Sequence, residues 1–201
     1  MARTKSQRRV VLKWGAIAAF LAVVIGMLLA LALGANGTTL ARMSVAQMAQ
    51  RADLIVRARC EGNTTAWDAG EIWTFTTFAV EESWKGEAPE KVHVRLLGGR
   101  AGEVTSTVDG VPRFREGEEV VVFLERTTRG DFSVLSWIQG TFRIRRNART
   151  GRETATQDTA AFAVYNPAVR RFEAAGAREE GAEQLKAEVL AAVAAGSGAE
   201  R

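Results

Sequence analysis

Few side chains in this sequence could act as metal ligands or catalytic bases. The 201 residues include one histidine, His93, and one cysteine, Cys60. A zinc site uses three or four ligands drawn mostly from these residue types, so the two cannot make one alone. A Ser-His-Asp triad would have to use His93, and the sequence has no Gly-x-Ser-x-Gly turn to hold the serine. We therefore predict no metal site, and we expect His93 to face solvent on a strand.

Other motifs that could do chemistry have simpler explanations. Glu81-Glu82 and Glu118-Glu119 are adjacent pairs, and neighbours on a strand point to opposite faces, so neither pair can flank one bond as acid and base. The segment 98–102 (GGRAG) is glycine-rich, but no helix pattern follows it, as a phosphate loop requires. We expect glycines with positive φ there. The sequence predicts no catalytic residue and no cofactor, and an enzyme site assembled from scattered residues is left as an alternative.

The single cysteine cannot form a disulfide within the chain. In an oxidising compartment Cys60 would be either buried and inert or bonded to another chain. It stands at the end of an apolar strand pattern, and that position favours burial.

Three aromatic residues are candidates for a binding surface. Trp73 and Phe75 lie two apart on one expected strand, so they share a face. We predict that this face belongs to the core, because aromatic residues dominate cores. The alternative is an outward face that docks a partner or a glycan, and Trp84 is the third residue assigned to such a surface.

A cluster of arginines forms a second candidate surface. Arg143, Arg145 and Arg146 lie on an expected strand, and Arg149 and Arg152 follow them. Such a patch could meet lipid phosphates or an acidic polymer by charge alone. The ordinary alternative is a strand edge that charge protects from aggregation.

The charge distribution argues against a nucleic-acid partner. The net charge is +4, but residues 1–14 carry five basic residues and no acidic one. The rest of the chain then holds 22 basic and 23 acidic residues, so it is nearly neutral. The hydrophobic fraction of 47%, with 3 prolines and 1 cysteine, also excludes a disordered or disulfide-stapled protein.

A long apolar segment follows the basic tail. Gly15 to Gly34 contains no charge, and a helix of this length spans about 30 Å, the thickness of a hydrocarbon core. Because basic flanks stay in the cytoplasm, we predict a single membrane-spanning helix in the cell membrane, with the rest of the chain outside the cytoplasm. A cleaved secretory signal is the alternative, since 30–32 (ALA) and 32–34 (ALG) offer cleavage patterns. Residues 8–13 (RRVVLK) also resemble a twin-arginine export signal, and an ordinary basic flank is the simpler interpretation.

The remaining residues suffice for one domain. We divide the chain into a cytoplasmic basic tail (1–14), the apolar segment (15–34), a spacer (35–43), an extracytoplasmic domain (44–195) and a disordered tail (196–201). A short helix to about Arg51 should open the domain, because Ser44 and Gln47 fit a capping box. The pattern of 181–195 predicts a C-terminal helix with one face docked on the domain.

Between the two helices the sequence has the pattern of strands. Runs rich in β-branched, aromatic or alternating apolar residues occupy 54–60, 72–80, 92–97, 119–124, 132–138, 141–146 and 161–165. The run 119–124 (EVVVFL) is largely apolar, which predicts a central strand buried on both faces. Short strands interrupted by glycine and charge clusters are typical of a barrel or a sandwich.

The order of several short motifs resembles netrin-like domains, the group that includes the tissue inhibitors of metalloproteinases. Residues 46–59 (AQMAQRADLIVRAR) are similar to that group's lead-in, Ala-Asp pair and first strand. The run 74–80 followed by Trp84-Lys85-Gly86 looks like the second strand and its turn, and 117–121 (GEEVV) looks like a later strand. The inhibitors act through an N-terminal cysteine, and this chain has only Cys60, so the resemblance does not extend to that mechanism.

A second resemblance is to uncharacterised exported bacterial proteins. It rests on the same pattern together with Gly98-Gly99 and 111–114 (VPRF). Both resemblances imply a mainly β fold, namely an OB-like barrel of five or six strands with a short N-terminal helix and a C-terminal helix.

These patterns predict a membrane-anchored or exported module of the cell envelope that binds or assembles without catalysis. Its expected partners are the membrane, through the N-terminal helix, and a protein or an envelope polymer. A protease-inhibitor-like activity, by a surface that needs no cysteine, is the alternative.

Overall fold

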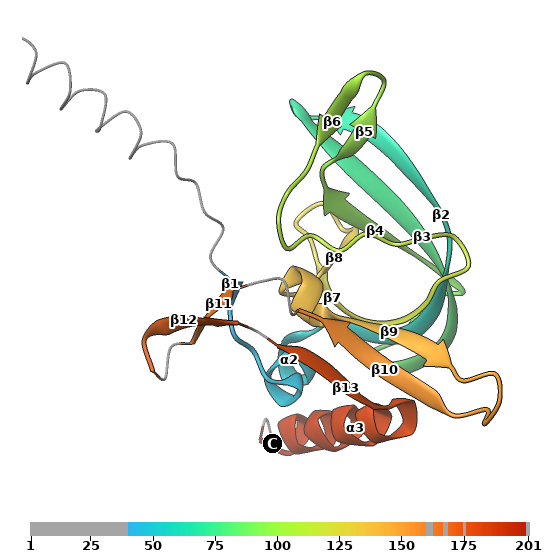
Figure 1. Ribbon diagram of the computed structural model, residues 1–201, viewed down its shortest axis with the longest axis vertical. Coiled ribbons are helices and arrows are strands. Elements are labelled where there is room, and N and C mark those ends of the chain that lie inside the picture. The colour runs from blue at the N-terminus through green and yellow to red at the C-terminus, as the bar shows by residue number, and fades with distance from the viewer. Residues whose placement is uncertain (1–39, 160–162, 167–168, 175, 200–201) are drawn as a thin grey trace, which may run out of the picture. The chain divides into compact units, whose positions relative to one another are not determined.

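The computed structural model of the chain describes residues 40–159, 163–166, 169–174 and 176–199. The predicted basic tail and the apolar segment from Gly15 to Gly34 lie outside these residues. Among the described residues, no helix combines the length and the apolar character that crossing a membrane demands. The described part is mainly β, as predicted (Figure 1).

Eight strands form the largest sheet, in the order β13-β10-β9-β7-β2-β3-β4-β8 (Figure 1). Their bounds are Leu54–Asp68 (β2), Glu71–Lys85 (β3), Lys91–Leu97 (β4), Glu119–Arg126 (β7), Phe132–Val134 (β8), Thr141–Arg146 (β9), Glu153–Asp158 (β10) and Ala177–Gly181 (β13). Neighbours are antiparallel, except that β4 and β8 are parallel. Strand β8 pairs with β7 as well as with β4, and β7 in turn pairs with β2.

Smaller elements flank this sheet. They are the hairpin of β5 (Gly99–Ala101) and β6 (Val104–Ser106), a sheet of β1 (Leu40–Ala41), β11 (Ala163–Asn166) and β12 (Arg171–Ala174), helix α2 (Val45–Arg51), the 3₁₀ turn η1 (Trp137–Gly140) and helix α3 (Ala182–Ala199). Helix α3 continues to Ala199, past residue 195, where the sequence pattern had placed its end.

Helix α2 begins where the capping box predicts. The Ser44 hydroxyl accepts a hydrogen bond from the Gln47 backbone N–H at 3.1 Å, and the Gln47 side-chain oxygen accepts one from the Ser44 N–H at 2.8 Å. These two bonds satisfy donors that the first turn of a helix leaves free. The helix then buries Val45, Met48 and Ala49.

One core, which we call the inner core, lies among β2, β3, β4, β7 and β8. Its buried members are Leu54, Val56, Ala58, Cys60, Phe78, Val92, Val94, Leu96, Val111, Phe114, Val120, Val122, Leu124 and Val134. We call the side of each strand that points to these residues its inner face and the opposite side its outer face.

A second core, the helix-covered core, lies on the outer face of β2, β7, β9 and β10. Helices α2 and α3 pack there against Ile55, Val121, Phe123, Phe142 and Ile144, among others. Leu185 and Val189 are buried in it, which confirms that one face of the C-terminal helix docks on the domain. Strand β7 supplies residues to both cores, so the prediction of a strand buried on both faces is also confirmed.

The predicted strand over 132–138 is wrong in its second half. Strand β8 stops at Val134, and Ser136 and Trp137 adopt left-handed φ values of 52° and 53° before the η1 turn. The chain folds back tightly here, since a Cβ placed on Gly140 would lie 2.1 Å from the Leu135 carbonyl oxygen. Only glycine permits that approach, and the tight turn therefore replaces the end of the strand.

Candidate binding surface on the outer face of β3 and β4

Trp73 and Phe75 lie on the outer face of β3, so the prediction that they belong to the core is wrong. Side chains alternate along a strand, and the inner face of β3 carries Ile72, Thr74, Thr76 and Phe78, all of them buried. Trp73 and Phe75 are partly exposed and are not among the buried residues of either core.

Arg95, on the outer face of β4, packs against both aromatic rings. Its guanidinium carbon lies 3.9 Å from the Trp73 ring centre and 5.7 Å from the Phe75 ring centre. Such contacts attract a cation to the ring face. The arginine is only 7% exposed, which is unusual for a charged side chain and requires compensating partners.

Two aspartates supply that compensation. Arg95 donates a hydrogen bond to Asp68 at 2.7 Å, and its other terminal nitrogen lies 3.6 Å from an Asp131 oxygen. Arg129 also contacts Asp68. The hydrogen bond from Arg95, aided by the charge of Arg129, lowers the pKa of Asp68. We call these six residues, Trp73, Phe75, Arg95, Asp68, Asp131 and Arg129, the Trp73 surface.

The elements that deliver these residues are far apart in the sequence. Asp68 is the last residue of β2, while Arg129 and Asp131 lie in the connection between β7 and β8. The pairing of β8 with both β4 and β7 places that connection close to Arg95. Sequence reasoning did not single out Arg95, Asp68 or Asp131, and the one available signal was a charged residue in the alternating strand 92–97.

Trp84 does not belong to a surface. It is 5% exposed, lies in the helix-covered core, and its indole N–H donates to Glu82 at 2.9 Å. Its assignment to a binding surface is therefore corrected, because the end of β3 passes beneath α3, whose Lys186 also contacts Glu82.

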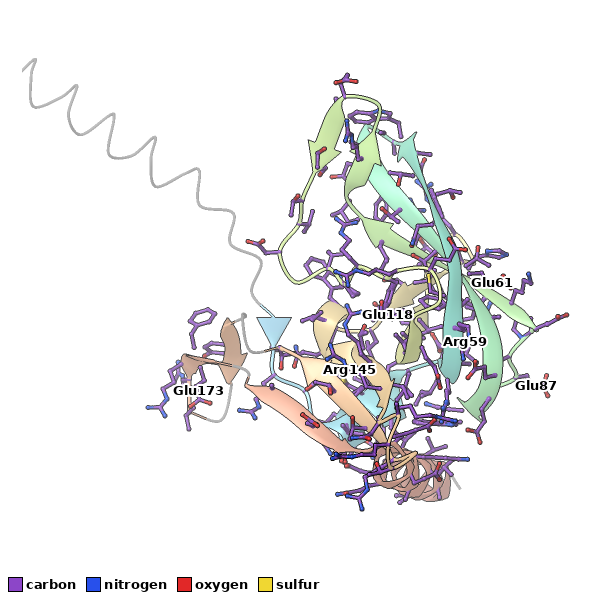
Figure 2. The ribbon with its side chains drawn as sticks, turned by 45° about the vertical axis from the view of Figure 1, so that its right-hand side comes forward. Arg59, Glu61, Glu87, Glu118, Arg145 and Glu173 are labelled. Carbon is purple, nitrogen blue, oxygen red and sulfur yellow. The ribbon has the colours of Figure 1, made fainter. Side chains whose placement is uncertain are left out.

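Ion pairs engage some of the arginines in the predicted basic cluster. Arg143 contacts Glu118, and Arg146 donates to Glu153 at 3.0 Å. Arg145 is exposed on β9 (Figure 2). Two of the three arginines assigned to a basic surface therefore already have carboxylate partners.

The glutamates of both adjacent pairs take part in ion pairs. Glu119 accepts a hydrogen bond from Arg57 at 2.6 Å, and the same arginine donates to Glu153 at 2.9 Å. Glu81 pairs with Arg59 at 2.9 Å. Hydrogen bonds from Arg57 and Arg146 lower the pKa of Glu153 to about 2. We call Arg57, Arg59, Arg146, Glu81, Glu119 and Glu153 the Arg57 network. It borders the helix-covered core.

His93 and Cys60 occupy the expected positions. His93 is exposed on the outer face of β4, where its Nδ1 lies 3.1 Å from the Thr77 hydroxyl. Cys60 is buried in the inner core, and burial raises the pKa of its thiol. Within the described ranges, no three His, Cys, Asp or Glu side chains gather closely enough to hold a metal ion.

The Trp73 surface is therefore a platform of two aromatic rings around an arginine whose charge two aspartates balance. It can provide contact area and shape to a partner. Comparison with protein-family models, curated proteins and solved structures gives no match for this chain.

Proposed function

We propose that this chain is a non-catalytic binding or assembly module of the cell envelope, held at the membrane or exported through residues 15–34. The observation that carries the proposal is the outward position of Trp73 and Phe75 around Arg95. Aromatic residues and arginine are the residue types that dominate the energetics of protein interfaces.

An OB-like barrel is the fold that we propose for strands β2, β3, β4, β7 and β8. The pairings of β8 with β4 and β7, and of β7 with β2, support this order of strands. The resemblance to netrin-like domains supports the same proposal. OB folds bind ligands on the face of their second and third strands and on the loops after the first and fourth. In this chain those places correspond to β3, β4, the turn after Asp68 and the connection that holds Arg129.

The charges of the Trp73 surface favour a protein partner. Arg95 and Arg129 are balanced by Asp68 and Asp131, so the surface offers no excess positive charge for a phosphate backbone. Half-buried aromatic rings instead gain free energy when a partner covers their remaining exposed area.

Photo-crosslinking in the producing cell tests this proposal. The full-length chain would carry a photoreactive phenylalanine analogue at His93, which is exposed on the outer face of β4, or at Leu190, which is exposed on α3. We expect one envelope protein to crosslink from position 93 and not from position 190. The crosslink should disappear in a Trp73→Ala, Phe75→Ala variant that still folds.

The outcomes separate the alternatives. A crosslinked protease would favour the inhibitor-like activity over an assembly role. Equal crosslinking from positions 93 and 190, or none from 93, would contradict the proposed surface.

The location of the domain has its own test. An alkaline phosphatase fused to the C-terminus is active only outside the cytoplasm, and we expect activity from this fusion. Activity of a cytoplasmic reporter at the same position would contradict the proposed orientation.

A further inference from the structure

A small polar cavity lies on the inner side of β3, across the strand from the Trp73 surface. Its volume is about 240 Å³, and β2, β3, β4, the β5–β6 hairpin and the segment before β7 contribute to its walls. Its polar lining consists of Asn63, Thr74, Thr105, Ser106, Thr107 and Arg113. None of the described residues that line it is acidic.

Among the described residues of this lining, Arg113 alone is charged, and no carboxylate pairs with it. Its Nη1 donates to the Thr74 hydroxyl at 3.2 Å and its Nη2 donates to the Leu97 carbonyl at 3.3 Å. Within the described ranges it forms no ion pair with a carboxylate, in contrast to Arg143, which contacts Glu118. A guanidinium has five N–H groups, so about three remain available.

Arg113 is exposed overall, and the burial of part of its side chain lowers the pKa of the guanidinium, with no neighbouring carboxylate to offset the effect. The same residue keeps one side open to solvent, so a ligand can reach it. An anion placed in the cavity would therefore pair with a cation that the fold has left without a partner.

Two glycines leave room for the residues that wall the cavity. Gly98 has a φ of +86°, and a Cβ there would lie 2.7 Å from the Nη2 of Arg113. Gly99 has a φ of +141°, and a Cβ there would lie 2.5 Å from the Thr74 hydroxyl. The sequence analysis predicted positive φ values for these glycines. The structure shows in addition that side chains at both positions would collide with residues of the cavity wall.

We infer that this cavity binds a small oxyanion, the phosphate or carboxylate group of a soluble ligand. The planar fork of Arg113 matches either group, and Thr105, Ser106 and Thr107 are further polar residues of the lining. A volume of about 240 Å³ is below the range of about 300–1,000 Å³ for drug-sized ligands, so it suits a small group rather than a polymer.

Amide chemical shifts of Ser106 and Thr107 can test this site in the full-length chain in a mild detergent. Inorganic phosphate and acetate would be titrated separately, at constant ionic strength. We expect saturable shifts, with an affinity that falls about tenfold or more in Arg113→Gln because a charge-assisted contact is lost. Arg115→Gln removes the same charge two residues further on, outside the cavity lining, and should leave the affinity unchanged.

A second variant keeps the test decisive if Arg113→Gln does not fold. Ser106→Ala removes one hydroxyl of the lining and should weaken binding by about two- to tenfold. A response to only one of the two anions would identify the ligand group as phosphate or carboxylate. Equal weakening in Arg113→Gln and Arg115→Gln, or no saturable response to either anion, would overturn the proposal.

Discussion

The outer side of the large sheet differs between its two halves. Over β2, β7 and β9 it carries an apolar core that α2 and α3 cover, in which Val121 and Phe123 are fully buried. Over β3 and β4 it carries Trp73 and Phe75, which stay partly exposed around Arg95. The first half holds the domain together, whereas the second does not close a core, and this difference is why we place binding on the second.

The largest expected effect comes from a charge placed under the helices. Phe123→Asp buries a carboxylate in the helix-covered core, where Phe123 has no exposed surface and pairs across the sheet with the apolar Ile55. We expect a loss of more than about 4 kcal/mol of stability, enough to unfold the domain. Chemical denaturation followed by circular dichroism measures this, and unchanged unfolding would show that β7 is not central.

The docking of α3 gives the next largest effect. Leu185 is fully buried and Leu190, on the same helix, is 43% exposed, so the two form a matched pair. We expect Leu185→Ala to cost about 2–5 kcal/mol and Leu190→Ala to stay within about 0.5 kcal/mol. If both variants unfold alike, the helix does not cover the sheet in the way described.

The Arg57 network should give an effect that depends on pH. The pKa of Glu153 is lowered to about 2 in the folded chain, whereas an unfolded glutamate titrates near about 4.3. Its contribution is therefore present above about pH 4.3 and is lost as the pH falls toward 2. Glu153→Gln should cost about 1–3 kcal/mol at pH 7 and should flatten the acid dependence.

Thermal unfolding between pH 2 and pH 7 measures both quantities. Glu87→Gln, at an exposed glutamate (Figure 2), is the control and should follow the parent chain at every pH. An unaltered acid dependence in Glu153→Gln would mean that other carboxylates govern acid unfolding.

The smallest effect is expected on the open half of the sheet. Trp73→Leu keeps apolar bulk but removes the ring against Arg95, and we expect a cost of about 0.5–2 kcal/mol. Differential scanning calorimetry can resolve such a change. A loss as large as that of Leu185→Ala would show that the Trp73 surface is structural, and it would remove the contrast between the two halves.

Local sequence patterns sufficed for the elements that depend on neighbouring residues. The capping box of Ser44 and Gln47 located α2, the apolar run 119–124 located β7, and four-residue spacing located the buried face of α3. Strands β10 and β13 were missed, because 153–158 and 177–181 are polar and carry no strong strand pattern. Pairing with β9 gives β10 its structure, and β13 pairs in turn with β10.

The orientation of β3 could not be read from its own residues. One face offered two aromatic rings, and the other offered Thr74 and Thr76, so the aromatic face looked like the core. The structure buries the threonines because their hydroxyls have partners: Thr74 donates to the Gly98 carbonyl at 2.7 Å and Thr76 to the Asn63 side chain at 2.6 Å. Those partners come from β2 and from the link between β4 and β5, so hydropathy alone gave the wrong face.

The candidate sites could not be predicted from the sequence for a related reason. Arg95 meets Asp68 and Asp131 only when three separate segments converge, and no local motif marks them. The proposed anion site likewise depends on Arg113 having no carboxylate partner. The sequence places Glu116 and Glu118 close by and so suggests that Arg113 is paired.

The reactivity of the single thiol, Cys60, can report how often the inner core opens. Because it is enclosed by the inner core and its ionisation is suppressed, an alkylating reagent can modify it only after β2 has parted from its neighbours. With a single cysteine in the chain, each molecule gains one adduct, and the rate of mass gain reports how often this region opens. The rate of local opening in the native state can thus be measured without an engineered label.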